Sequence, residues 1–145
     1  MIPKAMITTR YFNILTQHEI YDLDILEDLK FNVDEEFKKV YQALGFSRND
    51  FFDFKITVHI LSNQKVLSTV HKEIYGKPTN AKAIYSHLTR TIYLIEKFTK
   101  NEIQHELAHA ILHHWTGKKL PRVLDEMIAC WVDMKINWKE VNRWN

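Results

Sequence analysis

The sequence has few of the residues that cross-link a chain or break its secondary structure. Cysteine occurs once in 145 residues, which excludes a framework of intrachain disulfides and favours a reducing compartment. The three glycines and three prolines leave no room for a flexible linker, so each one becomes an informative mark of a turn or a helix end. No apolar run reaches the ~18 residues that a membrane-spanning helix needs.

The sequence also lacks a large excess of charge of either sign. The formal net charge is +2 and no dense block of lysine and arginine occurs, which argues against nucleic acid as a partner. The first residues lack the long apolar stretch and the cleavage site of a signal peptide. With 46% hydrophobic and 26% charged residues, the composition is that of an ordinary globular protein. We therefore expect one cytoplasmic domain over residues 1–145, with neither nucleic acid nor membrane as a partner.

Hydrophobic periodicity predicts the elements in the middle of the chain. Apolar and polar residues alternate over Phe54–Leu61, which is typical of a strand. A helix is expected to follow from a cap at Ser62 to about Tyr75, with Gly76 as its stop. The segment Ala83–Glu96 is rich in β-branched and aromatic residues, which indicates two short strands or one longer irregular strand.

The N-terminal part is harder to interpret. Asn32 and Glu35 resemble a capping box that begins a helix, and "YDLDILEDLK" before them could also be helical. We expect a mostly helical part over residues 1–50, a sheet over residues 51–98, and two helices over residues 99–145. The predicted fold class is α+β, with a small and mostly antiparallel sheet.

The stretch "QHELAHAILHHW" holds four of the eight histidines of the chain. His105, Glu106 and His109 have the spacing HExxH, for which composition alone predicts roughly 0.03 matches in a chain of this kind. The motif becomes informative only on a suitable helix. Thr99 and Glu102 form a T-x-x-E capping box just before it, which supplies that context.

The predicted helix is amphipathic and ends at Gly117. Its apolar face is made of Ile103, Leu107, Ile111 and Trp115. Both motif histidines lie on the opposite, polar face. We expect the apolar face to pack on the rest of the domain and the polar face to be free for a site.

The HExxH spacing suits zinc for a geometric reason. Residues four apart are neighbours on one helix face, so the imidazoles of His105 and His109 can converge on one metal ion. Glu106 leaves the helix about 100° from His105, where it can accept a proton from a zinc-bound water without becoming a ligand. The alternative is that these histidines are ordinary solvated or satisfied polar residues.

The third ligand decides the kind of site. His113 lies ~12 Å along the helix axis from His105 and is better explained as a residue behind the site or at an exposed helix end. His114 points toward the apolar face and suits the edge of the core. The metzincin pattern is absent, since it requires glycine and histidine where Leu112 and Trp115 stand.

A carboxylate on the next helix is the better candidate. Glu126 follows a turn that ends at Pro121, and its apolar sequence neighbours suggest a buried carboxylate that zinc would compensate. Asp125 competes for this role but is turned about 100° away. The alternative for Glu126 is an ion pair with Arg122, four residues earlier.

"HELAH" followed by "DEMIACW" resembles the HExxH…E-x-x-A pattern of zincin metallopeptidases of the glutamate-ligand branch, the gluzincins, and in particular of ImmA/IrrE-type peptidases and minigluzincins. The resemblance covers about Phe54 to Met134 and is specific only at the motif. Two positions depart from these patterns. Cys130 stands where thermolysin-like enzymes have an aspartate that orients a ligand histidine, and Ala108 replaces a glycine that is usual in the ImmA type.

The resemblance implies a zincin-like fold and a catalytic zinc site. It assigns His105, His109 and Glu126 to one zinc ion per chain, and Glu106 to the role of general base. It also implies that a peptide or protein substrate lies along an edge strand within Ala83–Glu96.

The predicted function is that of a zinc metalloprotease. The candidates for stabilising the oxyanion of the reaction are residues near the edge strand: Tyr85, His87, Arg90 and Tyr93. The alternative for each of them is an ordinary strand residue. Two other interpretations stay open at this stage. One is a latent or non-catalytic zinc-binding sensor, in which the C-terminal tail with Trp138 and Trp144 fills the cleft. The other is a helical interaction protein without a metal.

Overall fold

The computed structural model describes residues 5–16, 23–46 and 54–142, and the side chains within these ranges except those of residues 5, 23–32 and 138–142. The elements follow one another in the order β1 (Ala5–Thr8), β2 (Phe12–Thr16), α1 (Leu23–Ala43), β3 (Ile56–Leu61), α2 (Gln64–Tyr75), β4 (Ala83–Ser86), β5 (Thr91–Ile95), α3 (Lys100–Thr116) and α4 (Arg122–Asn142). The α+β class is confirmed.

The sheet has five strands in the order β1-β2-β3-β5-β4. Its two outer pairs, β1 with β2 and β4 with β5, are antiparallel, but the two central pairs are parallel. The expectation of a mostly antiparallel sheet was therefore wrong. The reason is that α1 returns the chain between β2 and β3, and α2 lies between β3 and the later strands, and helical crossovers join parallel strands.

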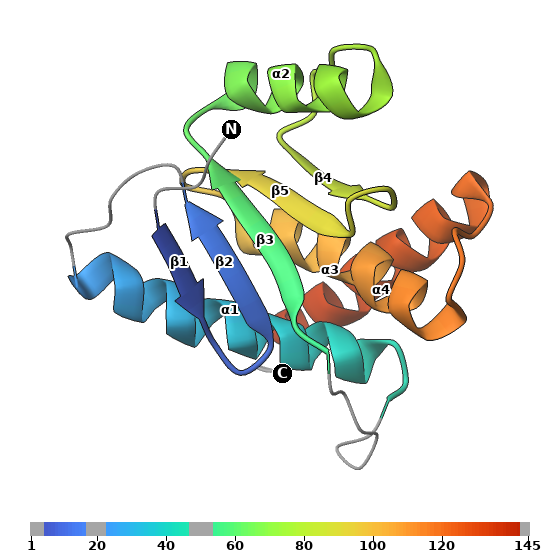
Figure 1. Ribbon diagram of the computed structural model, residues 1–145. Coiled ribbons are helices and arrows are strands. Elements are labelled where there is room, and N and C mark those ends of the chain that lie inside the picture. Colours follow the sequence, from blue (N-terminus) through green and yellow to red (C-terminus); the bar gives the residue numbers. More distant parts are fainter. Residues whose placement is uncertain (1–4, 17–22, 47–53, 143–145) are drawn as a thin grey trace.

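Helices cover both faces of the sheet (Figure 1). The larger core lies on the side of α1, α3 and α4, and it includes the fully buried side chains of Phe12, Phe37 and Leu107. A smaller core lies beneath α2 on the other side and is made of Leu61, Leu67, Val70 and Tyr93. The site described below belongs to the side of the larger core.

Most predicted elements in the second half of the chain are present. The segment 83–96 forms two strands, with Arg90 in the left-handed region (φ 53°) at the turn between them. Helix α2 is capped by Asn63 rather than by Ser62, since the Asn63 side chain accepts a hydrogen bond from the backbone N–H of Val66. Gly76 ends that helix as expected, with a φ of 80° that favours glycine.

The N-terminal part differs from the expectation. Helix α1 is longer than the capping-box pattern indicated and includes most of "YDLDILEDLK", but β1 and β2 were not predicted. Burial alternates along β2, where Phe12, Ile14 and Thr16 are buried, but the sequence does not alternate in the same way, since Leu15 is apolar and Thr16 is polar, so periodicity gave no clear signal for this strand.

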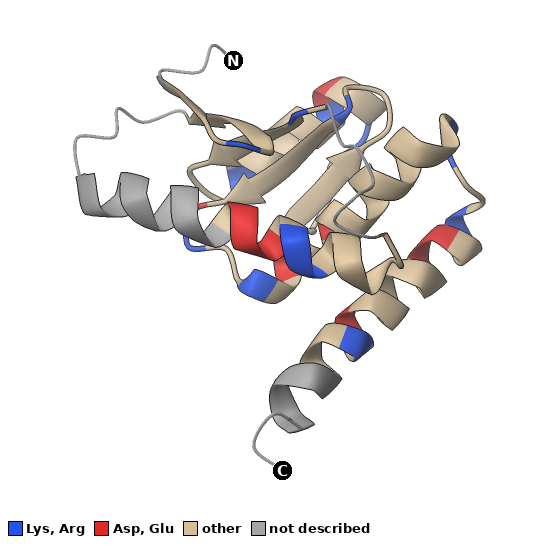
Figure 2. Ribbon diagram, turned by 90° about the horizontal axis from the view of Figure 1, so that it is seen from below, with Lys and Arg blue, Asp and Glu red and all other residues tan. Residues whose placement is uncertain are grey.

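Charged residues of both signs are interspersed along α1 and α4 (Figure 2). In the part of the chain that the structure describes, no helix is both long enough and apolar enough to cross a membrane.

Candidate metal centre

Helix α3 carries the motif and is fixed at both ends. The capping box is complete, because the Thr99 side chain accepts from the backbone N–H of Glu102 and the Glu102 side chain accepts from the backbone N–H of Thr99. Gly117 closes the helix with a φ of 68°. Ile103, Leu107 and Ile111 of the apolar face lie in the larger core as predicted, whereas Trp115 is 43% exposed and stacks on Phe46 at 4.9 Å between ring centroids. The polar face is thereby held toward α4 and β4.

Two imidazoles and one carboxylate converge between α3 and α4. The Nε2 atoms of His105 and His109 lie 3.2 Å apart. Glu126 Oε2 lies 3.2 Å from His105 Nε2, and Glu126 Oε1 lies 3.0 Å from His109 Nε2. These three residues form a group whose ligand atoms all lie within 4.8 Å of one another. The sequence prediction thus named the three side chains that the fold brings together.

Glu126 lies at the side of helix α4 because the helix packs against the protein through other positions. Asp125, Ala129 and Val132 face the core, so Glu126 is turned toward the side and its side chain stays 50% exposed. The expectation of a carboxylate buried among apolar neighbours was therefore wrong. Glu126 contacts the two histidines, and among the described residues no ion pair joins it to Arg122.

The far side of each imidazole meets another carboxylate. Asp133 Oδ2 accepts a hydrogen bond from His105 Nδ1 over 3.2 Å. Asp125 Oδ1 lies 2.8 Å from His109 Nδ1, although this contact is not aligned as a hydrogen bond. The hydrogen bond to Asp133 holds the proton of His105 on Nδ1, and the nearby Asp125 carboxylate favours a proton on Nδ1 of His109, which leaves the Nε2 lone pairs free for a metal.

The donor set fits a divalent cation. With their protons on Nδ1, two Nε2 lone pairs and a carboxylate face one another at 3.0–3.2 Å, an arrangement that repels itself unless a positive charge lies between the donors. Zn–N bonds of ~2.0–2.1 Å place tetrahedral ligands about 3.3–3.4 Å apart, close to the observed separations. Two imidazoles and one carboxylate are typical of zinc, though other transition metals accept the same ligands.

Glu106 is buried beside this group without belonging to it. Its side chain is 8% exposed, and burial raises the pKa of its carboxyl group, whereas nearby His109 and His105 act to lower that pKa. The backbone N–H of Tyr85 in β4 also acts to lower that pKa. Glu106 is therefore near both the three converging side chains and the edge strand of the sheet.

The other two histidines of the motif helix are outside the group. One interpretation of the sequence placed His113 at an exposed helix end, but the residue is buried (6% exposed). Its Nδ1 lies 2.8 Å from the Tyr85 hydroxyl, with which it forms a hydrogen bond. Burial lowers the pKa of His113, which favours the neutral imidazole. His114 stacks on Phe54 at 4.5 Å between ring centroids and is half-buried at the core edge, as expected.

The four oxyanion candidates divide into two pairs. Tyr85 and His87 lie on the side of the site, and His87 Nε2 is 3.5 Å from Asp125 Oδ2. Tyr93 belongs to the core on the opposite side of the sheet, and Arg90 is exposed in the turn. The predicted tail residues Trp138 and Trp144 lie outside the described side chains.

The position of Asp125 beside His109 was not predicted from the sequence, where Asp125 was considered only as a rival ligand. The same 100° turn that removes Asp125 from the metal position also places it behind the histidine.

Comparison with protein-family models, with curated proteins and with solved structures finds no match for this chain.

Proposed function

We propose that this protein is a zinc-dependent peptidase that hydrolyses peptide bonds of a protein or peptide substrate. One observation carries the proposal: the Nε2 atoms of His105 and His109 and the carboxylate of Glu126 converge at 3.0–3.2 Å, with the buried Glu106 next to them. Three protein ligands leave a fourth tetrahedral position open, which is typical of catalytic rather than structural zinc sites.

Each side chain has a separate part in the proposed reaction. Bound zinc would supply a Lewis acid that polarises the scissile carbonyl and makes water more acidic. Glu106 accepts the proton of the attacking water and passes it to the leaving amine. Burial raises the pKa of the Glu106 carboxyl group, which suits this role, because a carboxylate with a raised pKa is a stronger base and accepts the proton of water more readily.

The substrate lies along β4 in this proposal. That strand is at the edge of the sheet, so one of its sides has no strand neighbour among the described residues. An extended peptide adds to such an edge by main-chain hydrogen bonds. The packing of α3 against β4 supports this placement, since it puts the helix that carries the base next to the strand on which the peptide would lie. A cytoplasmic setting, expected from the single cysteine, is part of the same proposal.

Metal removal and reconstitution test the proposal. The chain is purified without a histidine tag, its metal content is measured, and its turnover of a mixed peptide library is followed by mass spectrometry. We expect one zinc per chain, cleavage that a chelator abolishes, and recovery on addition of zinc. A chain that holds no metal contradicts the proposal outright. A chain that holds zinc and cleaves nothing, with or without its last ten residues, supports the non-catalytic zinc-binding alternative instead.

A further inference from the structure

Helix α4 carries an unusual concentration of exposed apolar side chains. Nine large hydrophobic residues are exposed in the part of the chain that the structure describes, and five of them lie on this helix: Val123 (73% exposed), Leu124 (45%), Met127 (64%), Trp131 (51%) and Met134 (71%). Single exposed apolar residues are normal, but a contiguous row indicates a binding surface.

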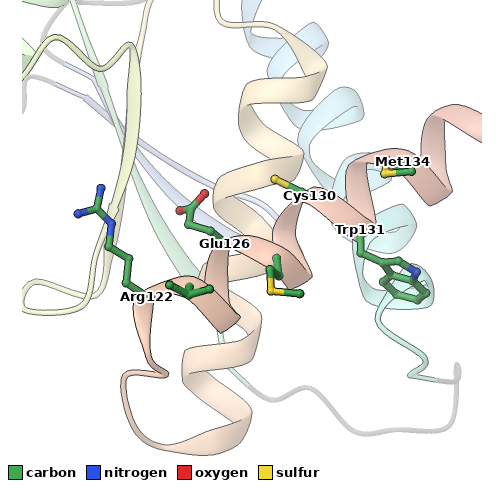
Figure 3. A pocket seen from close by; sticks show the side chains of 7 residues that line it. Arg122, Glu126, Cys130, Trp131 and Met134 are labelled. Atoms are coloured by element: carbon green, nitrogen blue, oxygen red, sulfur yellow. The ribbon is translucent and has the colours of Figure 1, made fainter.

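Four of these five residues line a shallow groove. We call it the α4 groove, and it is lined by Arg122, Val123, Glu126, Met127, Cys130, Trp131 and Met134. All seven side chains come from α4, with the Glu126 carboxylate toward one end of the row and Trp131 and Met134 toward the other (Figure 3). The spacing of three and four residues keeps them on one side of the helix.

The α4 groove is continuous with the candidate metal centre through one residue. Glu126 lines the groove, and its carboxylate oxygens contact the Nε2 atoms of His105 and His109. A chain that fills the groove therefore passes within one side-chain length of the metal ligands. This continuity distinguishes the groove from an apolar surface elsewhere on the protein.

We infer that the α4 groove binds large apolar side chains of the peptide substrate close to the bond that is cleaved. This inference rests on the proposed function and adds a substrate class to it: peptides with bulky aliphatic or aromatic residues near the scissile bond. The two methionines suit such a role, since their unbranched, polarizable side chains adapt to apolar partners of different shapes.

The place of the groove favours a peptide substrate over a second folded copy of the chain. Glu126 lines the groove and also contacts His105 and His109, so a short extended segment that places a few side chains on the groove reaches the candidate metal centre.

Two glutamine substitutions in the groove test the inference. Met127→Gln and Met134→Gln keep the side-chain length and a good helix former at positions that are more than 60% exposed, so the fold should be unaffected. Met6→Gln is the matched control, because Met6 is also 65% exposed but lies on β1 at the opposite edge of the sheet. Zinc content is measured for every variant.

Binding and cleavage are measured separately. Peptides from a random library are first selected on the Glu106→Gln chain, which should bind without cleaving, and their affinities are then measured for the groove and control variants. We expect selection of peptides with bulky apolar residues, and about a tenfold weaker affinity for the double groove variant, with no change for Met6→Gln. In the active chain, kcat/KM for these peptides should fall about as much while the zinc content stays the same.

Three outcomes overturn the inference. Selected peptides without an apolar preference would do so, as would a double groove variant that binds and cleaves like the parent. Self-association of the parent that the double variant abolishes would assign the groove to a second copy. Apolar-selective binding with no cleavage by the zinc-loaded parent would instead contradict the proposed function, and would leave the groove as a peptide-binding site with no substrate role.

Discussion

The carboxylate of Asp133 accepts a hydrogen bond from Nδ1 of His105 over 3.2 Å, on the side of the ring away from Glu126. Cys130 stands where thermolysin-like enzymes have an aspartate that orients a ligand histidine, so this chain lacks a carboxylate at that position. The chain supplies that carboxylate from a position three residues later on α4, nearly one helical turn away. Asp125 Oδ1 also lies 2.8 Å from Nδ1 of His109, although this contact is not aligned as a hydrogen bond.

We predict that Asp133→Asn weakens zinc binding without removing it. An amide in place of the carboxylate no longer favours the Nδ1 proton as strongly, so the ligand basicity of His105 falls and the affinity for zinc drops by about 10–100-fold. Competition with a chelator of known affinity measures this. Glu73→Gln, on the exposed side of α2, serves as the control. Unchanged affinity in Asp133→Asn would show that the observed hydrogen bond has no part in metal binding.

The identity of the third ligand is tested by two alanine variants. We expect Glu126→Ala to lose most of its zinc, because only two protein ligands remain, and His113→Ala to keep a full equivalent, because His113 points to Tyr85. Elemental analysis of both proteins after dialysis gives the answer. The opposite result, full zinc in Glu126→Ala and loss in His113→Ala, would mean that the ligand set is wrong.

Local sequence signals predicted the helix α3 and the convergence of His105 and His109 on it. A capping box, a terminal glycine and helical periodicity are encoded within one segment, so Thr99, Glu102 and Gly117 could be interpreted without knowledge of the fold. The same holds for the convergence of His105 and His109, which follows from the geometry of one helix.

Relationships between distant segments could not be predicted in the same way. The parallel pairing of β3 with β2 and β5 depends on where α1 and α2 return the chain, which no local pattern specifies. The exposure of Glu126 depends on which face of α4 packs against α3, and the apolar sequence neighbours Val123 and Met127 suggested burial although both are exposed. Their exposure is a feature of the α4 groove.

The packing of α3 can be tested by two leucine substitutions. Leu107 is fully buried beneath the motif, so Leu107→Ala should lower the free energy of unfolding by about 2–5 kcal/mol. Leu124 is 45% exposed, and Leu124→Ala should cost less than about 1 kcal/mol. Urea denaturation of both variants measures the difference. Equal costs would be incompatible with the packing of α3 on the larger core.

Stability should depend on pH through His59, which lies on β3 away from the site. Its Nε2 is buried and has no hydrogen-bond partner in the described structure, and burial lowers the pKa of its imidazole. The unfolded chain then binds a proton at His59 more readily than the folded chain does. The contribution of neutral His59 to the free energy of unfolding is therefore fully present above the ordinary pKa of about 6.5, and it is lost as pH falls below that value.

We expect His59→Phe to reduce this loss. Phenylalanine keeps an aromatic ring near Tyr93 but takes up no proton. The free energy of unfolding is measured by urea denaturation between pH 5 and 8, with a chelator present to remove effects of bound metal. It should vary less with pH for the variant than for the parent. The same pH dependence of the free energy of unfolding in both proteins would show that His59 does not contribute to it.

The central claim is that Glu106 acts as a general base beside a zinc ion held by His105, His109 and Glu126. The most direct measurement is peptide turnover by Glu106→Gln, with zinc content determined on the same samples. Glutamine keeps the size of the side chain but does not take a proton from water at neutral pH. We predict full zinc content and a loss of turnover by roughly 10²–10⁴-fold. Undiminished cleavage by Glu106→Gln with zinc present would contradict the account.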